Sequence, residues 1–164
     1  MTAGLAACSA EVSVGGDPSL SGGEIAAGIT EQYEERFPGL TLAEMTCRGA
    51  EAEVGAPIRC EGVNSGGVDL EFGGEITAVD EENDAADYRW EITRAVVPGS
   101  FYEERATPII EREAQVTVQS ITCPERVEIR EGVEFQCEVT TTDGTTAPVT
   151  VTVTDNNGDF RVRG

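Results

Sequence analysis

The chain has 164 residues and a formal net charge of −20, because 31 acidic residues face only 11 basic ones, all arginine. Such a field disfavours nucleic acid, which proteins bind by neutralising phosphates with arginine and lysine. Histidine and lysine are absent. Their absence excludes Ser-His-Asp and Cys-His catalysis, histidine-ligated metals, Schiff bases and phosphate-loop lysines. We therefore expect no enzymatic activity, no cofactor and no nucleic-acid partner.

The N-terminal residues 1–20 are predicted to be a signal remnant followed by a flexible tether. Residues 4–9 (GLAACS) resemble the lipobox that ends a bacterial lipoprotein signal peptide, in which the cysteine, here Cys8, is acylated. Cys8 is also the odd cysteine among five. The charged and apolar parts of such a signal do not precede it, so we expect the start to lie further upstream. If Met1 is the true start, the chain is instead cytosolic and the motif is a coincidence. Residues 9–20 are small and polar and contain Gly and Pro, as in a tether.

Residues 21–95 and 96–164 are predicted to be two copies of one small domain. In the first copy, a capping box at residues 21–24 (SGGE) precedes an apolar stripe, and Pro38-Gly39 ends the helix. In the second, Pro108 interrupts the stripe, so it either kinks the helix or begins a second segment. The stripes are Ile25, Ile29, Tyr33 and Phe37 in the first copy and Tyr102, Ala106, Ile109 and Ile110 in the second.

Alternating apolar residues after each helix predict four or five antiparallel strands. In the first copy these strands include Ala52 and Val54, and they end with a strand around Trp90. The fold class is therefore α+β, with one helix on a small antiparallel sheet in each copy. We expect Trp90 to pack one face into the core, and contact with a partner is the less favoured alternative.

Four cysteines form two matched pairs, C-x12-C at Cys47 and Cys60 and C-x13-C at Cys123 and Cys137. Four cysteines allow three connectivities, and the repeat favours a disulfide within each copy. A redox pair or a zinc site is the alternative, but the spacing is too long for a C-x-x-C motif and two thiolates make a poor zinc site.

The second copy carries Cys123-Pro124, then residues 132–137 (GVEFQC), then residues 149–155 (VTVTVTD). This pattern resembles the actinobacterial family called domain of unknown function 4333. The first copy departs from it, with Arg48 in place of the proline and Ile58 in place of the phenylalanine. The resemblance implies a tethered protein of the cell envelope and supplies no catalytic residues.

An acidic turn places Asp80, Glu82 and Asp84 at the first, third and fifth positions of an EF-hand-like loop. Ala85 stands where that loop requires glycine, and the flanking segments are predicted strands. We therefore interpret it as a solvated turn, with these three residues as weak calcium candidates.

These patterns predict a lipid-anchored protein on the extracytoplasmic face of the cell membrane. Its membrane contact would be the acylated Cys8, and its role would be that of a binding or adaptor module for an envelope protein or wall component. Duplicated domains often serve avidity. The alternatives are an extracellular small-ligand or calcium binder and, less favoured, a hydrolase that acts through carboxylates alone.

Overall fold

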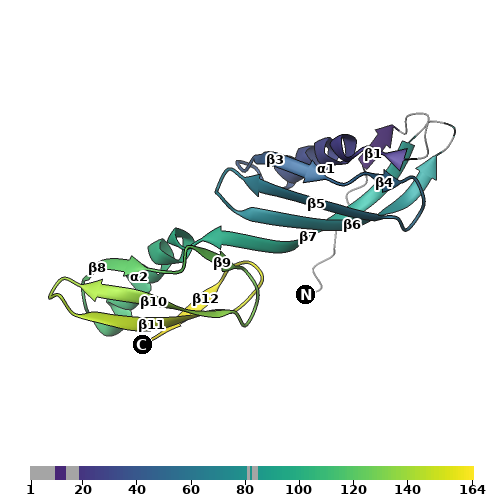
Figure 1. Ribbon diagram of the computed structural model, residues 1–164. Helices are drawn as coiled ribbons and strands as arrows, with labels where there is room; N and C mark the ends of the chain where they lie inside the picture. The colour runs from purple at the N-terminus through teal and green to yellow at the C-terminus, as the bar shows by residue number, and fades with distance from the viewer. Residues whose placement is uncertain (1–9, 14–18, 81, 83–84) are drawn as a thin grey trace. The chain divides into compact units, whose positions relative to one another are not determined.

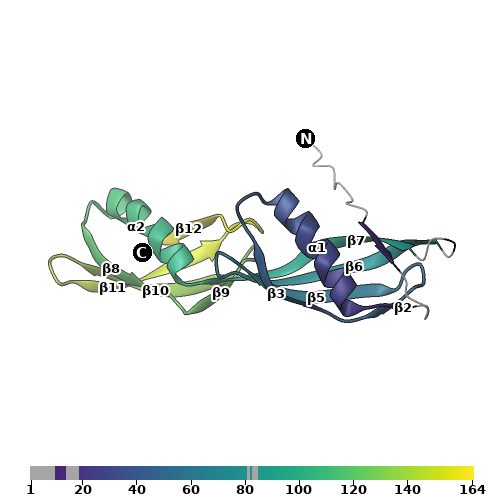
Figure 2. The ribbon, with the colours of Figure 1, turned by 90° about the horizontal axis from the view of Figure 1, so that it is seen from above.

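The computed structural model describes residues 10–13, 19–80, 82 and 85–164, and these form two compact units, Met1–Thr93 and Arg94–Gly164. We call them the N-terminal and C-terminal units (Figures 1 and 2). Each contains one helix and an antiparallel sheet, so the predicted α+β class is confirmed. Neither described helix is long and apolar enough to cross a membrane.

The N-terminal unit has a sheet in the order β1-β7-β6-β5-β3 and a separate ribbon of β2 with β4. Helix α1 lies across one face of this sheet (Figure 2). The sheet strands are antiparallel in register, with Cys60 opposite Phe72 on β5 and β6. The elements are β1 Ala10–Ser13, β2 Ser19–Leu20, α1 Gly22–Arg36, β3 Leu42–Cys47, β4 Ala50–Glu51, β5 Pro57–Asn64, β6 Asp69–Asp80 and β7 Ala85–Pro98.

The C-terminal unit has a sheet in the order β12-β11-β10-β8, and β9 pairs with Val96–Pro98, the last residues of β7. Helix α2 contacts β8 and β12, the two edge strands of this sheet. The elements are α2 Ser100–Ala114, β8 Val118–Thr122, β9 Arg126–Glu128, β10 Glu134–Thr141, β11 Thr146–Val153 and β12 Phe160–Arg163.

Helix α1 begins and ends where its local sequence predicts. The Ser21 hydroxyl accepts the backbone N–H of Glu24, and the Glu24 carboxylate accepts the backbone N–H of Ser21, which completes the capping box. The helix stops before Pro38-Gly39, where Gly39 adopts a φ of +91°. The predicted stripe is buried at Ile25, Ile29 and Tyr33, while Phe37 is half-buried beyond the last turn.

Helix α2 runs unbroken through Pro108, so the alternative that this proline begins a second segment is wrong. Pro108 is exposed and has no N–H to donate, yet the helix continues to Ala114. Tyr102, Ala106 and Ile110 are buried, whereas Ile109 is only half-buried.

Two expectations for the N-terminal unit are wrong. Ala10–Ser13 and Ser19–Leu20, predicted to lie in a tether, pair with β7 and β4 respectively, and Leu20 is 1% exposed. Strand edges elsewhere in the chain provide these backbone partners, which the composition of a short polar segment does not reveal. Val54, predicted to lie in a strand, is 63% exposed, because β4 ends at Glu51 and Gly55 turns the chain at a φ of +89°.

Candidate ligand-binding site

The paired cysteines form disulfide bonds within each unit, as predicted. Cys47–Cys60 joins neighbouring strands β3 and β5, and Cys123–Cys137 joins β10 to the residue that follows β8. Cys60 and Cys137 are buried, with 3% and 1% of their surface exposed. These four sulfurs are therefore covalently engaged, and neither a zinc site nor a free thiol pair is present at them. Cys8, the predicted acylation site, lies outside the described residues.

The predicted calcium candidates do not assemble into a site in the part of the chain that the structure describes. Asp80 accepts the backbone N–H of Glu82 at 3.0 Å, as in an ordinary polar turn, and Asp84 lies outside the described residues. No group of three or more histidine, cysteine, aspartate or glutamate side chains among the described residues is placed to hold a metal ion.

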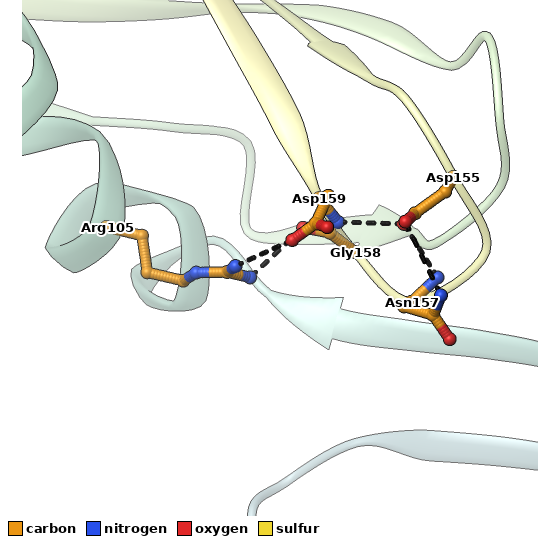
Figure 3. A network of polar contacts seen from close by, with 5 residues as sticks. All are labelled: Arg105, Asp155, Asn157, Gly158 and Asp159. Carbon is orange, nitrogen blue, oxygen red and sulfur yellow. Dashed lines mark hydrogen bonds and ion pairs between the residues drawn. The ribbon is translucent and has the colours of Figure 1, made fainter.

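The turn between β11 and β12 is organised from within the chain (Figure 3). Asp155 Oδ1 accepts the backbone N–H groups of Asp159 and Asn157, at 3.0 and 2.8 Å. These hydrogen bonds hold the pKa of Asp155 below its ordinary value, and the bond from Asp159 has the largest effect. Its carboxylate is thus committed to the turn.

Arg105 closes the same turn from helix α2 (Figure 3). Its guanidinium donates to the Gly158 carbonyl at 3.0 Å and lies 3.4 Å from an Asp159 carboxylate oxygen. It also stacks on two aromatic rings, with centroids at 4.8 Å for Phe101 and 5.3 Å for Phe160. Arg105 is therefore a cation that lies near two aromatic rings and makes its hydrogen bonds within its own unit.

The clearest candidate for a binding site is a hollow of about 740 Å³ in the N-terminal unit, which we call the Trp90 hollow. It lies where α1 ends above the sheet, between that helix end and strands β6 and β7. Ile92 lines the hollow and is 37% exposed. The lining residues are Arg36, Phe37, Gly73, Gly74, Glu75, Arg89, Trp90, Glu91, Ile92 and Thr93.

The aromatic floor of the Trp90 hollow is fixed by contacts from three elements. The indole Nε1–H of Trp90 donates to Gln32 Oε1 on α1 at 2.7 Å. The Trp90 ring meets Phe72 of β6 edge to face, with centroids 5.5 Å apart, and Phe72 meets Tyr33 in the same way. Phe37 packs on Tyr33 at 4.8 Å. The indole N–H is hydrogen-bonded to Gln32 and the ring packs against Phe72. Trp90 therefore offers a preformed apolar surface.

Arg36 forms the cationic side of the hollow. Its guanidinium carbon lies 5.6 Å from the Phe37 centroid and 6.0 Å from the Trp90 centroid, within the range of a cation–π contact. Arg89, the other cation of the lining, is paired with Glu75 at 2.6 Å. Among the described residues, Arg36 has no hydrogen bond or ion pair from its side chain. Its position in the last turn of α1 suits a cation, because the helix dipole is negative there.

A second hollow, of about 590 Å³, adjoins the first at Gly73, Gly74 and Thr93. It contains Arg48, which follows β3, and Arg59 of β5, and the backbone N–H of Arg48 donates to the Arg59 carbonyl. Both arginines are exposed, and neither stacks on a ring in the described part of the chain. They therefore lack the fixed placement of Arg36.

The sequence indicated only part of the Trp90 hollow. The sequence offers contact with a partner as the less favoured alternative for Trp90. In the structure Trp90 is half-buried and lines the hollow. Arg36 carried no sequence signal, because 54 positions separate it from Trp90 and only the packing of α1 on the sheet brings them together.

The fold defines an α+β protein of two units, each with one disulfide bond of its own. Residues 93–158 match the model of one family, described as Domain of unknown function (DUF4333). The predicted family resemblance is thereby supported for this segment of the chain. Comparison with curated proteins and with solved structures found no match.

Proposed function

We propose that this protein is a non-enzymatic binding or adaptor module of the cell envelope. Acylated Cys8 would hold it on the extracytoplasmic face of the membrane. The lipobox-like residues 4–9 and the odd cysteine support the anchor. The two disulfides support export, since such bonds persist in oxidising compartments.

We further propose that the two units are tandem copies of the family domain of actinobacterial type. Corresponding positions 77 residues apart support this. Leu20 and Val97 are both 1% exposed, and both lie just before a helix. Cys60 and Cys137 are likewise both buried in disulfides. Gly22 and Gly99 both lie at a helix start, where an added Cβ would collide with a backbone carbonyl oxygen. That oxygen belongs to Cys47 for Gly22 and to Pro124, the residue after Cys123, for Gly99.

The observation that carries the binding role is the Trp90 hollow. It joins a tryptophan held by a hydrogen bond, a phenylalanine, and an arginine whose side chain has no acceptor among the described residues. Tryptophan and arginine are enriched in interfaces and their hot spots. The hydrolase alternative requires buried carboxylates facing a cleft. The buried polar residues of the described chain are instead Asn64 and Thr152, with no carboxylate among them. Binding is therefore the better supported role.

Two measurements in the native host test this proposal, with the gene expressed together with its upstream DNA. The intact mass should correspond to a chain that starts at Cys8, carries acyl groups and gains about four hydrogens on reduction. A chain that starts at Met1 with five free thiols would refute the anchor and the export.

A photo-crosslinking amino acid at position 92 should then yield a specific adduct in intact cells. The same group at position 54 is the matched control, because Val54 is an exposed aliphatic residue of the same unit outside the Trp90 hollow. Equal adducts from both positions, or none from position 92, would contradict a binding role for the hollow.

A further inference from the structure

The two units contain two arginines in similar aromatic settings but with different hydrogen bonding. Arg105 stacks on Phe101 and Phe160 and has acceptors at Gly158 and Asp159 (Figure 3). Arg36 stacks on Phe37 and Trp90 at comparable distances but lacks any acceptor among the described residues. Arg105 thus shows what completes such a cation, namely oxygen atoms that accept from its guanidinium.

We propose that the Trp90 hollow binds a carboxylate attached to an apolar group, and that Arg36 pairs with the carboxylate. This inference rests on the binding role proposed for the hollow and specifies its ligand. The Arg36 guanidinium lies within cation–π range of two rings. Its fork of N–H donors matches the two oxygens of a carboxylate. The ring of Trp90 and the side chain of Ile92 supply the apolar surface beside it.

The surrounding charges favour a single negative charge on the ligand. Glu75 and Glu91 line the same hollow, and Arg89 is already paired with Glu75. The chain as a whole has a formal net charge of −20. Of the two arginines in the lining, only Arg36 has no ion pair within the part of the chain that the structure describes. One arginine balances a monocarboxylate but not a phosphate with two charges.

Such a carboxylate has two sources, a small apolar acid or the free C-terminus of a polypeptide that ends in an apolar residue. In both molecules the carboxylate lies close to an apolar side chain or group. The hollow of about 740 Å³ accommodates either, since ligand pockets are commonly a few hundred to about a thousand Å³.

The sole tryptophan of the chain makes a direct test possible, because its indole N–H gives a single resonance in a ¹H–¹⁵N spectrum. The purified protein is titrated with N-acetyl-leucine and with an acetylated pentapeptide that ends in leucine, each beside its C-terminal amide. The free acid of at least one pair should shift the resonance saturably and bind roughly tenfold or more tighter than its amide, as expected for a hydrogen bond to a charged group. The tighter acid identifies the source.

Substitutions separate Arg36 from general charge effects. Arg36→Gln should reduce the affinity for the acid to that for the amide, and Arg36→Lys should retain part of the preference. Arg48→Gln, an exposed arginine of the same unit outside the Trp90 hollow, should leave it unchanged. Equal binding of acid and amide, no shift with either acid, or equal losses in Arg36→Gln and Arg48→Gln would overturn the inference. If position 92 still gave its specific adduct in cells, the proposed binding role would stand without this ligand.

Discussion

Two buried tyrosines of the N-terminal unit differ in one respect, the hydrogen bonding of their hydroxyl groups. Tyr33 is 2% exposed, and its hydroxyl accepts a hydrogen bond from Asn64 Nδ2 at 3.1 Å. Asn64 in turn accepts the backbone N–H groups of Gly66 and Val68, so this contact ties the β5–β6 turn to helix α1. Tyr88 is 1% exposed, and its buried hydroxyl has no hydrogen-bond partner in the described structure.

We predict opposite outcomes for Tyr33→Phe and Tyr88→Phe. Tyr33→Phe leaves a buried amide donor of Asn64 without its acceptor, which should lower the free energy of unfolding by about 1–3 kcal/mol. Tyr88→Phe removes a polar group that is buried without compensation. It should leave the free energy of unfolding unchanged or raise it by up to about 1–3 kcal/mol. The ring volume is the same in each pair, so packing contributes little to the difference.

Urea unfolding followed by Trp90 fluorescence measures both variants, because Trp90 is the sole tryptophan and lies in the N-terminal unit. A loss in Tyr88→Phe as large as that in Tyr33→Phe would refute the reasoning. Alkaline pH gives a second readout. Burial, with a smaller effect of Glu31, raises the pKa of Tyr88 to about 12, so wild-type stability should fall as pH rises from about 10 to 12. Tyr88→Phe should reduce that fall.

Two further predictions concern a helix start and an acidic turn. Gly22→Ala should destabilise the protein in urea unfolding, because the new Cβ would collide with the Cys47 carbonyl oxygen. Gly23→Ala, where the new Cβ meets open space, should raise the free energy of unfolding by up to about 0.5–1 kcal/mol. Losses of equal size would contradict this. The lowered pKa of Asp155 stabilises the fold above its unfolded pKa of about 4, and this contribution disappears as pH falls through the lower folded value. Asp155→Asn keeps the acceptor oxygen, so unfolding curves at pH 7 and pH 3 should differ less in this variant than in wild type, and an equal difference would argue against the assignment.

Features that depend on neighbours in the sequence were predictable. The capping box needs only Ser21 and Glu24, three residues apart, and the helix stop needs only Pro38-Gly39. The stripe on α1 follows from the helical period, and the cysteine spacing pointed to a disulfide in each copy. The α+β class follows from the order of these elements.

Features that depend on strand pairing were not predictable from the same evidence. Ala10–Ser13 and Ser19–Leu20 have the composition of a tether, yet they form strands because distant edges at β7 and β4 complete their hydrogen bonds. The strand predicted at Val54 is wrong in the opposite sense, because its apolar side chain lies in an exposed turn. Strand formation is decided by partners that the local pattern does not contain.

The candidate site shows the same division. By itself, the sequence determined the charge, the missing catalytic side chains, the helix limits and the paired cysteines, all of which are properties of single residues or short spacings. Only the tertiary structure decided that Arg36 lies over Trp90 and that Gln32 accepts the indole N–H. These contacts join residues more than fifty positions apart, and they arise because burial of the α1 stripe fixes how the helix lies on the sheet.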